Sequence, residues 1–358
     1  MTTPVSALTP SSVPELVDAV RSAPRVVAVG AGTKPRLAQV PTEFRRISTA
    51  KLSGIVEYEP SEFTFTALAG TPLREIVAEV EQRGQYLPFD PLLADAGATL
   101  GGTVAAGLSG PGRFRFGGLR DFILGVRFVD GDGRLLRLGG RVVKNAAGFD
   151  VPKFFVGSAG RFGVMAELTF KVFPRPVVRR TLRLEAKDTA AQMRLIQEAA
   201  NTRWEIDALE LSLEESAVWI RLGGPAVALE ALTAEIAARW PARTLDDGAA
   251  AEFWSRLAGF RWAHPDGTLV KLALAPGQVV AFRAQVQSIA GARGWVSNGG
   301  NTGYLSLPAG TPVPALTWPA VTLRGTGPLW PGPMRRFEAM RAVKAALDPQ
   351  NRFPNLDE

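Results

Sequence analysis

Short runs of alternating apolar and polar residues mark the first half of the chain, as expected of half-buried β-strands. The clearest run covers residues 164–172 and ends before Pro174. Further strands are predicted at residues 26–29, 63–69, 125–129 and 134–138, the last two joined as a hairpin through Asp-Gly-Asp-Gly. Thr71-Pro72 opens an amphipathic helix between them.

A different order of elements is predicted after Pro174-Arg175-Pro176, which is interpreted as a linker. The pattern predicts a strand at 179–184, a helix at 189–200, a strand pair within 209–222, a helix at 226–240 and a last helix at 331–347. This order favours a small antiparallel sheet covered by helices.

The distribution of residue types also divides the chain, because every tryptophan follows residue 200 and the densest glycine runs precede residue 165. We therefore predict a first domain over 1–174, a second over 175–325, and a C-terminal helix and tail over 326–358 that return to the first. A length of 358 residues, 46% of them hydrophobic, suits two packed domains.

Composition narrows the chemistry further. No cysteine is present, so the chain alone supplies no disulfide, iron–sulfur ligand or thiolate zinc site. No apolar run is long enough to span a membrane, and Pro4, Ser6 and Pro10 stand where a signal peptide would be basic and then apolar. We expect a cytoplasmic protein, which could still meet the inner membrane through partners.

The formal charge of +7 raises the question of nucleic-acid binding. The basic residues are spread along the chain without a basic run, so an anionic small molecule or an acidic partner surface fits better. His264 is the only histidine, which excludes Ser–His nucleophile pairs and histidine-based metal sites. It lies in a turn-like stretch, where a packing role is favoured over a role as base, and no metal site is predicted.

The first glycine-rich segment is Val-Gly-Ala-Gly-Thr-Lys-Pro at residues 29–35, directly after a predicted strand. Glycines there permit positive φ and let N–H groups converge on an anion. A Rossmann turn is not favoured, because Pro35 replaces its third glycine and Pro41 leaves room for only a stub of helix.

The second segment covers residues 97–118 and is dense in glycine, alanine and threonine, which favours neither a helix nor a strand. Such density indicates a large ligand lying against main chain. Thr99 and Thr103 could donate hydroxyls to phosphate, and the N–H groups around Gly101 and Gly102 could form an anion nest. Arg113 and Arg115, just beyond, could meet a phosphate or a carboxylate.

A third feature is the Arg120-Asp121 pair before a predicted strand. The fourth places Gly157, Gly160 and Gly163 ahead of the strand at 164–172, where a Rossmann turn would lead into a helix. Lys144 and Ser158 could reach phosphate oxygens.

Together these segments resemble the FAD-binding domain of the vanillyl-alcohol oxidase superfamily, also called the PCMH type, and within it the family of E subunits of bacterial glycolate oxidases. The resemblance lies in VGAGTKP at 29–35, ATLGGTVAAGLSGPGR at 98–113, RDFILGVRFVDGDG at 120–133 and GGRVVKNAAGFDVPKFFVGSAGRFGV at 139–164. It implies an α+β fold: a two-subdomain PCMH-type FAD-binding domain followed by an α+β cap domain with an antiparallel sheet.

The resemblance also implies which residues contact FAD. They are Gly30, Ala31, Gly32, Thr33, Lys34, Pro35, Ala98, Thr99, Gly101, Gly102, Thr103, Ala105, Ala106, Asp121, Lys144, Gly148, Phe149, Asp150, Gly157, Ser158, Gly160, Gly163 and Val164. No histidine lies in these segments, so we expect the FAD to be noncovalent. Phe149 and Ala159 depart from the family pattern, as does the tail after Asn351.

The function implied is that of an FAD-binding subunit of a glycolate oxidase complex, which oxidises a small 2-hydroxy acid and passes electrons to partners, namely an iron–sulfur subunit and a second FAD subunit. Two alternatives stay open. One is an assembly or electron-relay subunit whose FAD turns over no substrate. The other is an autonomous FAD-dependent 2-hydroxy-acid dehydrogenase or a related reductase. The catalytic base is not identified, and Asn298-Gly299-Gly300-Asn301 is the polar cluster to inspect near a flavin.

Overall fold

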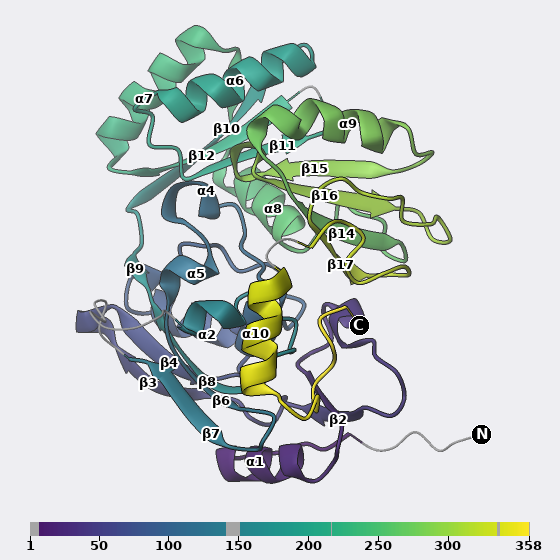
Figure 1. Ribbon diagram of the computed structural model, residues 1–358. Helices are drawn as coiled ribbons and strands as arrows, with labels where there is room; N and C mark the ends of the chain where they lie inside the picture. The colour runs from purple at the N-terminus through teal and green to yellow at the C-terminus, as the bar shows by residue number, and fades with distance from the viewer. Residues whose placement is uncertain (1–6, 141–150, 216, 335–336, 358) are drawn as a thin grey trace.

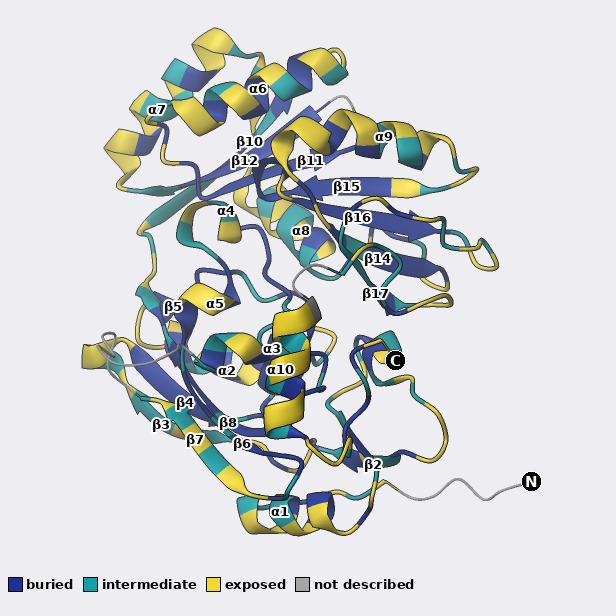
Figure 2. Cartoon of the chain, viewed as in Figure 1, coloured by how far each residue is buried: buried dark blue, intermediate teal, exposed yellow. Residues whose placement is uncertain are grey.

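The chain folds into two lobes, each built on its own antiparallel sheet (Figure 1). The computed structural model describes residues 7–140, 151–215, 217–334 and 337–357. The central strands of both sheets are mostly buried, while the edge strands and the outer helices show exposed positions (Figure 2). This mixture of packed helices and antiparallel sheets confirms the predicted α+β class.

The first lobe centres on a five-stranded sheet in the order β3-β4-β8-β6-β7. Its strands are β3 (Ile55–Glu59), β4 (Thr64–Leu68), β6 (Ile123–Val129), β7 (Leu135–Gly139) and β8 (Val164–Lys171). The predicted hairpin is confirmed, since Val129 pairs with Leu135 across the Asp-Gly turn. The alternating run at 164–172 forms β8, the central strand.

Short helices and two small sheets complete this lobe. The helices are α1 (Val13–Arg21), α2 (Leu73–Glu81), α3 (Leu100–Ala106), α4 (Arg113–Phe116) and α5 (Leu119–Phe122), with 3₁₀ turns η1 (Pro35–Ala38), η2 (Pro60–Glu62) and η3 (Val151–Phe155). The paired strands are β1 (Val26–Val29) with β2 (Arg45–Ser48), in parallel, and β5 (Gln85–Tyr86) with β9 (Phe173–Pro174). Pro174, predicted to open a linker, therefore ends a strand, because edge pairing to β5 needs no proline N–H.

The second lobe holds an eight-stranded sheet in the order β13-β10-β12-β11-β15-β16-β14-β17. The strands are β10 (Val178–Glu185), β11 (Ala208–Ser212), β12 (Ala217–Gly224), β13 (Ala242–Thr244), β14 (Thr268–Ala273), β15 (Arg293–Ser297), β16 (Thr302–Leu307) and β17 (Ala320–Arg324). The predicted small sheet is thus larger than expected, because β14 to β17 extend it.

Helices cover the two faces of this sheet differently. Those present are α6 (Thr189–Asn201), α7 (Ala226–Arg239), α8 (Asp247–Ala258) and α9 (Val279–Gln287), with 3₁₀ turns η4 (Pro276–Gln278) and η5 (Asn298–Gly300). Helices α6, α7 and α9 pack on the outer face, whereas α8 lies on the inner face toward the first lobe (Figure 1). The inner face shares one apolar core with the first lobe, which includes Trp219, Leu257 and Trp295.

The chain finally returns to the first lobe through α10 (Phe337–Leu347) and the tail. The predicted start at residue 331 is wrong, since 331–334 are not helical; Pro331 and Pro333 oppose a regular helix there. The buried Lys344 ammonium donates to the Arg161 and Phe353 carbonyls, both at 3.0 Å, and to the Asp348 carboxylate at 2.5 Å. These bonds fix the tail inside the first lobe.

Ion pairs join the lobes. The buried guanidinium of Arg221 on β12 pairs with Asp90 of the first lobe, and Arg115 on α4 pairs with Asp207 at 2.9 Å. The exact domain limits at 174 and 325 stay a prediction. Within the described residues, no helix combines the length and apolar character needed to cross a bilayer.

Candidate functional site

Two neighbouring cavities lie where the glycine-rich segments meet. The first, here called the glycine cavity, has a volume of about 430 Å³. Its lining comprises Ala28, Val29, Gly30, Ala31, Gly32, Thr33, Lys34, Pro35, Leu37, Ala38, Gln39, Arg46, Thr99, Gly102, Ala105, Ala159, Gly160 and Gly325. Most of these residues expose main chain or small side chains to the cavity, which suits a ligand that lies against backbone.

Backbone donors line one wall of the glycine cavity. The N–H groups of residues 31–34 donate no hydrogen bond to any residue the structure describes. Gly32 has a φ of +71°, and a Cβ there would meet no atom within 4 Å. A left-handed glycine amid consecutive free N–H groups is the geometry of an anion-binding nest.

Lys34 adds a positive charge to the same wall. Its side chain is buried, and the ammonium donates to the Thr33 hydroxyl at 2.9 Å. Burial lowers the pKa of Lys34 to about 8, since its charged form is poorly solvated. An anionic group in the cavity would stabilise that charge.

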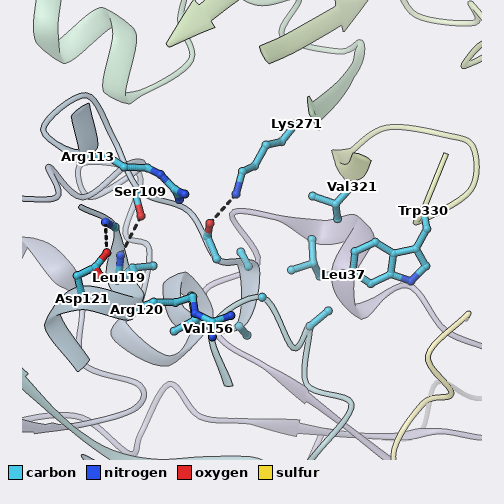
Figure 3. Close-up of a pocket in the computed structure, with 16 residues that line it drawn as sticks. Leu37, Ser109, Arg113, Leu119, Arg120, Asp121, Val156, Lys271, Val321 and Trp330 are labelled. Atoms are coloured by element: carbon cyan, nitrogen blue, oxygen red, sulfur yellow. Dashed lines mark hydrogen bonds between the residues drawn. The ribbon is translucent and has the colours of Figure 1, made fainter. Parts of the chain in front are cut away.

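The second cavity, here called the lysine cavity, has a volume of about 370 Å³ and lies between the lobes (Figure 3). Its lining comprises Leu37, Ala105, Ala106, Gly107, Ser109, Arg113, Gly118, Leu119, Arg120, Asp121, Val156, Gly157, Ala159, Lys271, Val321 and Trp330. It shares Leu37, Ala105 and Ala159 with the glycine cavity. One elongated ligand could therefore occupy both.

Three cationic residues line the lysine cavity, Arg113 and Arg120 from the first lobe and Lys271 from the second. Lys271 extends from β14 and donates to the Gly107 carbonyl at 2.6 Å, and Arg113 extends from α4 (Figure 3). Burial and the positive charge of Arg113 together lower the pKa of Lys271 to about 8. Such mutual repulsion would be relieved by a bound anion, so this end of the cavity suits a carboxylate or phosphate.

The segment at 97–107 differs from its prediction. Residues Leu100–Ala106 form helix α3, whose N-cap Thr99 accepts from the Gly102 N–H at 3.2 Å. The Gly101 N–H donates to the Ala69 carbonyl at 2.7 Å. The predicted nest at Gly101 and Gly102 is therefore wrong, because these donors already have protein partners; the free donors lie at 31–34.

Glycines explain the close approach of η3 and β8 to the cavities. Gly157 and Gly160 have φ values of +85° and +76°, and a Cβ at either would meet no atom within 4 Å. Space is therefore open on the cavity side of both. Gly163 differs, since a Cβ there would lie 2.8 Å from the Phe128 ring and 2.8 Å from the Val129 carbonyl oxygen, so its glycine serves packing.

The structure brings many, though not all, of the predicted residues together. The glycine cavity takes Gly30, Ala31, Gly32, Thr33, Lys34, Pro35, Thr99, Gly102, Ala105 and Gly160, and the lysine cavity takes Ala105, Ala106, Asp121 and Gly157. Ala98, Gly101, Thr103, Ser158, Gly163 and Val164 line neither cavity. Lys144, Gly148, Phe149 and Asp150 lie outside the described residues.

Two other sequence candidates lie away from these cavities. A ring nitrogen of His264, Nε2, lies 2.8 Å from the Gly291 carbonyl, and His264 lines neither cavity, which agrees with a packing role. The cluster at 298–301 forms η5 and its C-cap, and Asn298 donates to the Thr302 hydroxyl at 3.1 Å. Among the described residues, no group of three His, Asp or Glu side chains could hold a metal ion.

Comparison with known proteins finds a family match within the first lobe. Residues 4–139 match the family model of the FAD binding domain. This segment is therefore similar to FAD binding domains. The match covers β1, the 31–34 wall and α3, so the FAD binding domain contributes most of the lining of both cavities.

Curated relatives extend the similarity. Over 211 residues the chain is 41% identical to glycolate oxidase subunit GlcE of Escherichia coli (strain K12), covering 57% of this chain and 55% of that protein. It is 31% identical to glycolate oxidase subunit GlcD of Bacillus subtilis (strain 168) over 170 residues, 47% of this chain and 36% of that protein. A D-lactate dehydrogenase of Anaerostipes hadrus is 32% identical over 130 residues, 36% of this chain and 27% of that protein. The matched regions thus span about half or less of these relatives.

Solved structures support the fold of the whole chain. Two structures of alkyldihydroxyacetonephosphate synthase superpose with TM-scores of 0.65 and 0.67 over 96% of this chain and 75% of that chain. Identity is 15% in both, so this likeness concerns the fold alone. It includes both lobes, whereas the FAD binding domain match stops at residue 139.

The residues present fit FAD. The free N–H groups of residues 31–34 and the buried Lys34 ammonium suit a diphosphate, and the open positive-φ glycines 157 and 160 leave room beside the main chain. The two cavities share three lining residues, so an elongated dinucleotide in the glycine cavity could extend toward the lysine cavity.

Sequence reasoning missed the cap residues of the site. Lys271, Val321 and Trp330 line the lysine cavity but lie more than 100 residues beyond the last glycine segment. One signal was available: Lys271 interrupts the apolar run of β14, where a charged residue needs a specific partner. Nothing in the pattern tells which cavity that strand would face.

Proposed function

We propose that this chain is the FAD-binding subunit of a glycolate oxidase complex, oxidising a small 2-hydroxy acid. FAD would be held noncovalently, and electrons would pass to a partner iron–sulfur subunit beside a second FAD subunit. The similarity to subunits GlcE and GlcD supports this assignment. The complex would be cytoplasmic, with contact to the inner membrane only through partners.

The FAD binding domain would hold the cofactor with two kinds of group. The N–H groups of residues 31–34 and the Lys34 ammonium would bind the diphosphate, while Gly157 and Gly160 would allow it close to main chain. FAD supplies the hydride acceptor that the side chains lack. We also propose that residues 1–174 form the FAD-binding domain, 175–325 its cap, and 326–358 the returning tail.

The observation that carries the proposal is that cations from both lobes line the lysine cavity. Lys271 comes from the cap and Arg113 from the FAD binding domain, and both line the same cavity. A 2-hydroxy acid presents one carboxylate, which such a pair would neutralise and orient. Leu37, Val321 and Trp330 line the same cavity with apolar surface and would limit water around the bound acid.

One observation favours the electron-relay alternative. Among the described residues lining the lysine cavity, Asp121 is the only carboxylate, and its Oδ2 accepts from the Gly118 N–H at 2.8 Å. No histidine lines that cavity. A subunit whose FAD relays electrons without oxidising substrate needs no base, so this alternative is kept beside the autonomous dehydrogenase.

Reduction of the flavin by glycolate tests the proposal. Purified chain should show flavin absorption that moves wholly into the supernatant after acid precipitation. Anaerobic glycolate should then bleach the flavin band, with multiple turnovers once partner subunits and an electron acceptor are added. Turnover by the chain alone would favour the autonomous enzyme, and a flavin that glycolate never reduces in the assembled complex would favour the relay.

Substitution of Lys271 tests whether this side chain binds the carboxylate of the 2-hydroxy acid. Lys271→Met should lower kcat/KM by about 10- to 100-fold, since a charge-assisted hydrogen bond contributes about 1.5–3 kcal/mol. Lys171→Met is the matched control, because Lys171 lies on strand β8 above the Phe122 ring and lines neither cavity. Equal losses in the two variants would contradict the assignment of Lys271.

A further inference from the structure

A third cavity lies inside the cap, between helix α8 and the inner face of the eight-stranded sheet. Its volume is about 250 Å³. The residues that line it, here called the aromatic pocket, are Ser212, Glu214, Glu215, Trp219, Phe253, Arg256, Leu257, Trp262, Arg293 and Trp295. None of them lines the glycine cavity or the lysine cavity. The aromatic pocket is therefore separate from the proposed FAD site.

Four aromatic side chains form its walls and brace one another. The Trp219 ring stacks on Phe253 at a centroid distance of 5.0 Å and on Trp295 at 5.6 Å. The Trp262 and Trp295 rings lie 5.8 Å apart. Trp295 is fixed further by its indole N–H, which donates to the buried Glu210 carboxylate at 2.7 Å. Mutually packed rings give rigid flat walls, which suit a planar ligand.

The charged side chains at the rim differ in how far their hydrogen-bonding groups already have partners. Glu214 accepts hydrogen bonds from the Gly294 N–H at 2.7 Å and the Ser212 hydroxyl at 3.2 Å, and Glu215 pairs with Arg183 at 3.5 Å. Both carboxylates are therefore engaged.

The two arginines at the rim have more unused N–H donors than the carboxylates have unused acceptors. Arg293 donates to the Trp262 carbonyl through one nitrogen at 2.9 Å. The Arg256 side chain makes no ion pair or hydrogen bond with any residue that the structure describes. The rim therefore offers guanidinium donors while its acceptors are occupied, which favours an anion.

We propose that the aromatic pocket binds a small aryl carboxylate, with its ring against the tryptophans and its carboxylate on Arg256 and Arg293. Size agrees, because a cavity of about 150 Å³ accommodates benzene, and a ring with a short acidic arm needs somewhat more. This site is distinct from the lysine cavity, so its occupancy does not depend on the proposed 2-hydroxy-acid chemistry.

Tryptophan fluorescence of the FAD-loaded full chain tests the proposal with phenylacetate as probe. Phenylacetate should quench the emission saturably, since three of the eight tryptophans line the pocket. Phenylacetamide keeps the ring without the charge, and acetate keeps the charge without the ring. Each should bind at least about tenfold more weakly than phenylacetate, because each lacks one of the two interactions.

Substitutions of arginines test which side chain contacts the carboxylate of phenylacetate. Arg256→Gln should weaken phenylacetate binding about tenfold, the loss expected from one exposed charge-assisted contact. Arg261→Gln is the control, because Arg261 follows the same helix, pairs with Glu252 at 3.1 Å and does not line the pocket. Both substituted side chains are exposed, so neither variant should unfold.

Three outcomes would overturn the proposal. The first is the absence of saturable quenching, and the second is equal affinity for phenylacetate and phenylacetamide. The third is displacement of phenylacetate by glycolate together with a change in the flavin spectrum, which would place the probe in the lysine cavity. Independent binding of phenylacetate and glycolate is the result we expect.

Discussion

The glycine cavity and the lysine cavity adjoin each other but are built in opposite ways. The glycine cavity takes its character from main chain and small residues, many of them in one run from Ala28 to Ala38. The lysine cavity takes its positive charge from Arg113 and Arg120 of the first lobe and from Lys271 of the second, which lies far from them in sequence. The first is a property of local backbone conformation, whereas the second exists only after the cap has docked.

This difference separates two tasks. A cofactor that stays bound is best held by backbone donors that need no rearrangement, as the 31–34 wall provides. A substrate that enters and leaves is better met by side chains from two lobes. Changes to the glycine cavity should therefore abolish cofactor binding, while changes to the lysine cavity should alter affinity for the acid and leave FAD in place.

The largest effect is expected from Gly32→Val. A valine side chain would enter the open space of the glycine cavity, and the φ of +71° would add backbone strain of about 1–3 kcal/mol. We expect the purified variant to retain less than about a tenth of the wild-type FAD, because both the donors and the space are disturbed. The ratio of flavin to protein absorbance measures this.

Gly84→Val separates strain from loss of the cavity. Gly84 has a φ of +65° with no atom within 4 Å of an added Cβ, and it lines neither cavity. The two variants should lose similar unfolding free energy, but Gly84→Val should keep its FAD. If both variants lost FAD equally, instability alone would explain the result and the role of the 31–34 wall would fail.

A second, smaller effect concerns the residue that supports both cavities. The guanidinium of the fully buried Arg161 donates to the Leu37 carbonyl at 2.8 Å and to the Ala159 carbonyl. Leu37 and Ala159 line both cavities. We expect Arg161→Met to lower the unfolding free energy by about 3 kcal/mol, since buried acceptors lose a charged donor. Chemical denaturation of the FAD-free protein measures it.

Arg341→Met provides the comparison for that loss, because Arg341 is exposed on α10 and lies 3.9 Å from Glu338. It should change the unfolding free energy by no more than about 0.5 kcal/mol. In Arg161→Met, affinity for FAD and for the acid should fall together. A variant that lost only one of them would show that the two cavities are supported independently.

The sequence predicted the glycine cavity far better than the lysine cavity. The conformation of Gly30 to Pro35 depends on residues adjacent in the chain, so the strand-to-turn pattern was sufficient. Even there, α3 was missed, because its glycines are poor helix formers and tertiary packing decides the outcome. Donors were therefore predicted at Gly101 and Gly102 as well as in the turn at 29–35, and only those of the turn lack protein partners among the described residues.

Lys271 could not be assigned in the same way. Strand β14 is recognisable as apolar, but its position beside β16 and β17 depends on pairing across the whole cap. The final helix shows a similar limit, since its apolar stripe was visible while its start depended on Pro331 and Pro333. Local conformation was therefore predictable, and contacts between lobes were not.

The last expected effect is a pH dependence of the affinity for glycolate, which depends on Lys271 in the lysine cavity. Burial and the charge of Arg113 lower the pKa of Lys271 to about 8, so the ammonium is present below that pH and is lost above it. Affinity for glycolate should be constant below about pH 7.5 and then fall by up to about tenfold per pH unit, because deprotonation removes the carboxylate's partner.

Two controls separate this effect from other titrations. Lys271→Arg should keep the affinity constant to higher pH, since arginine stays charged. The uncharged analogue glycolamide should show no such fall with the wild-type protein. Titration of the flavin spectrum with each ligand from about pH 6 to 10 measures these affinities. A wild-type affinity that stayed constant to the alkaline end would remove Lys271 from the acid site and leave only the glycine cavity assigned.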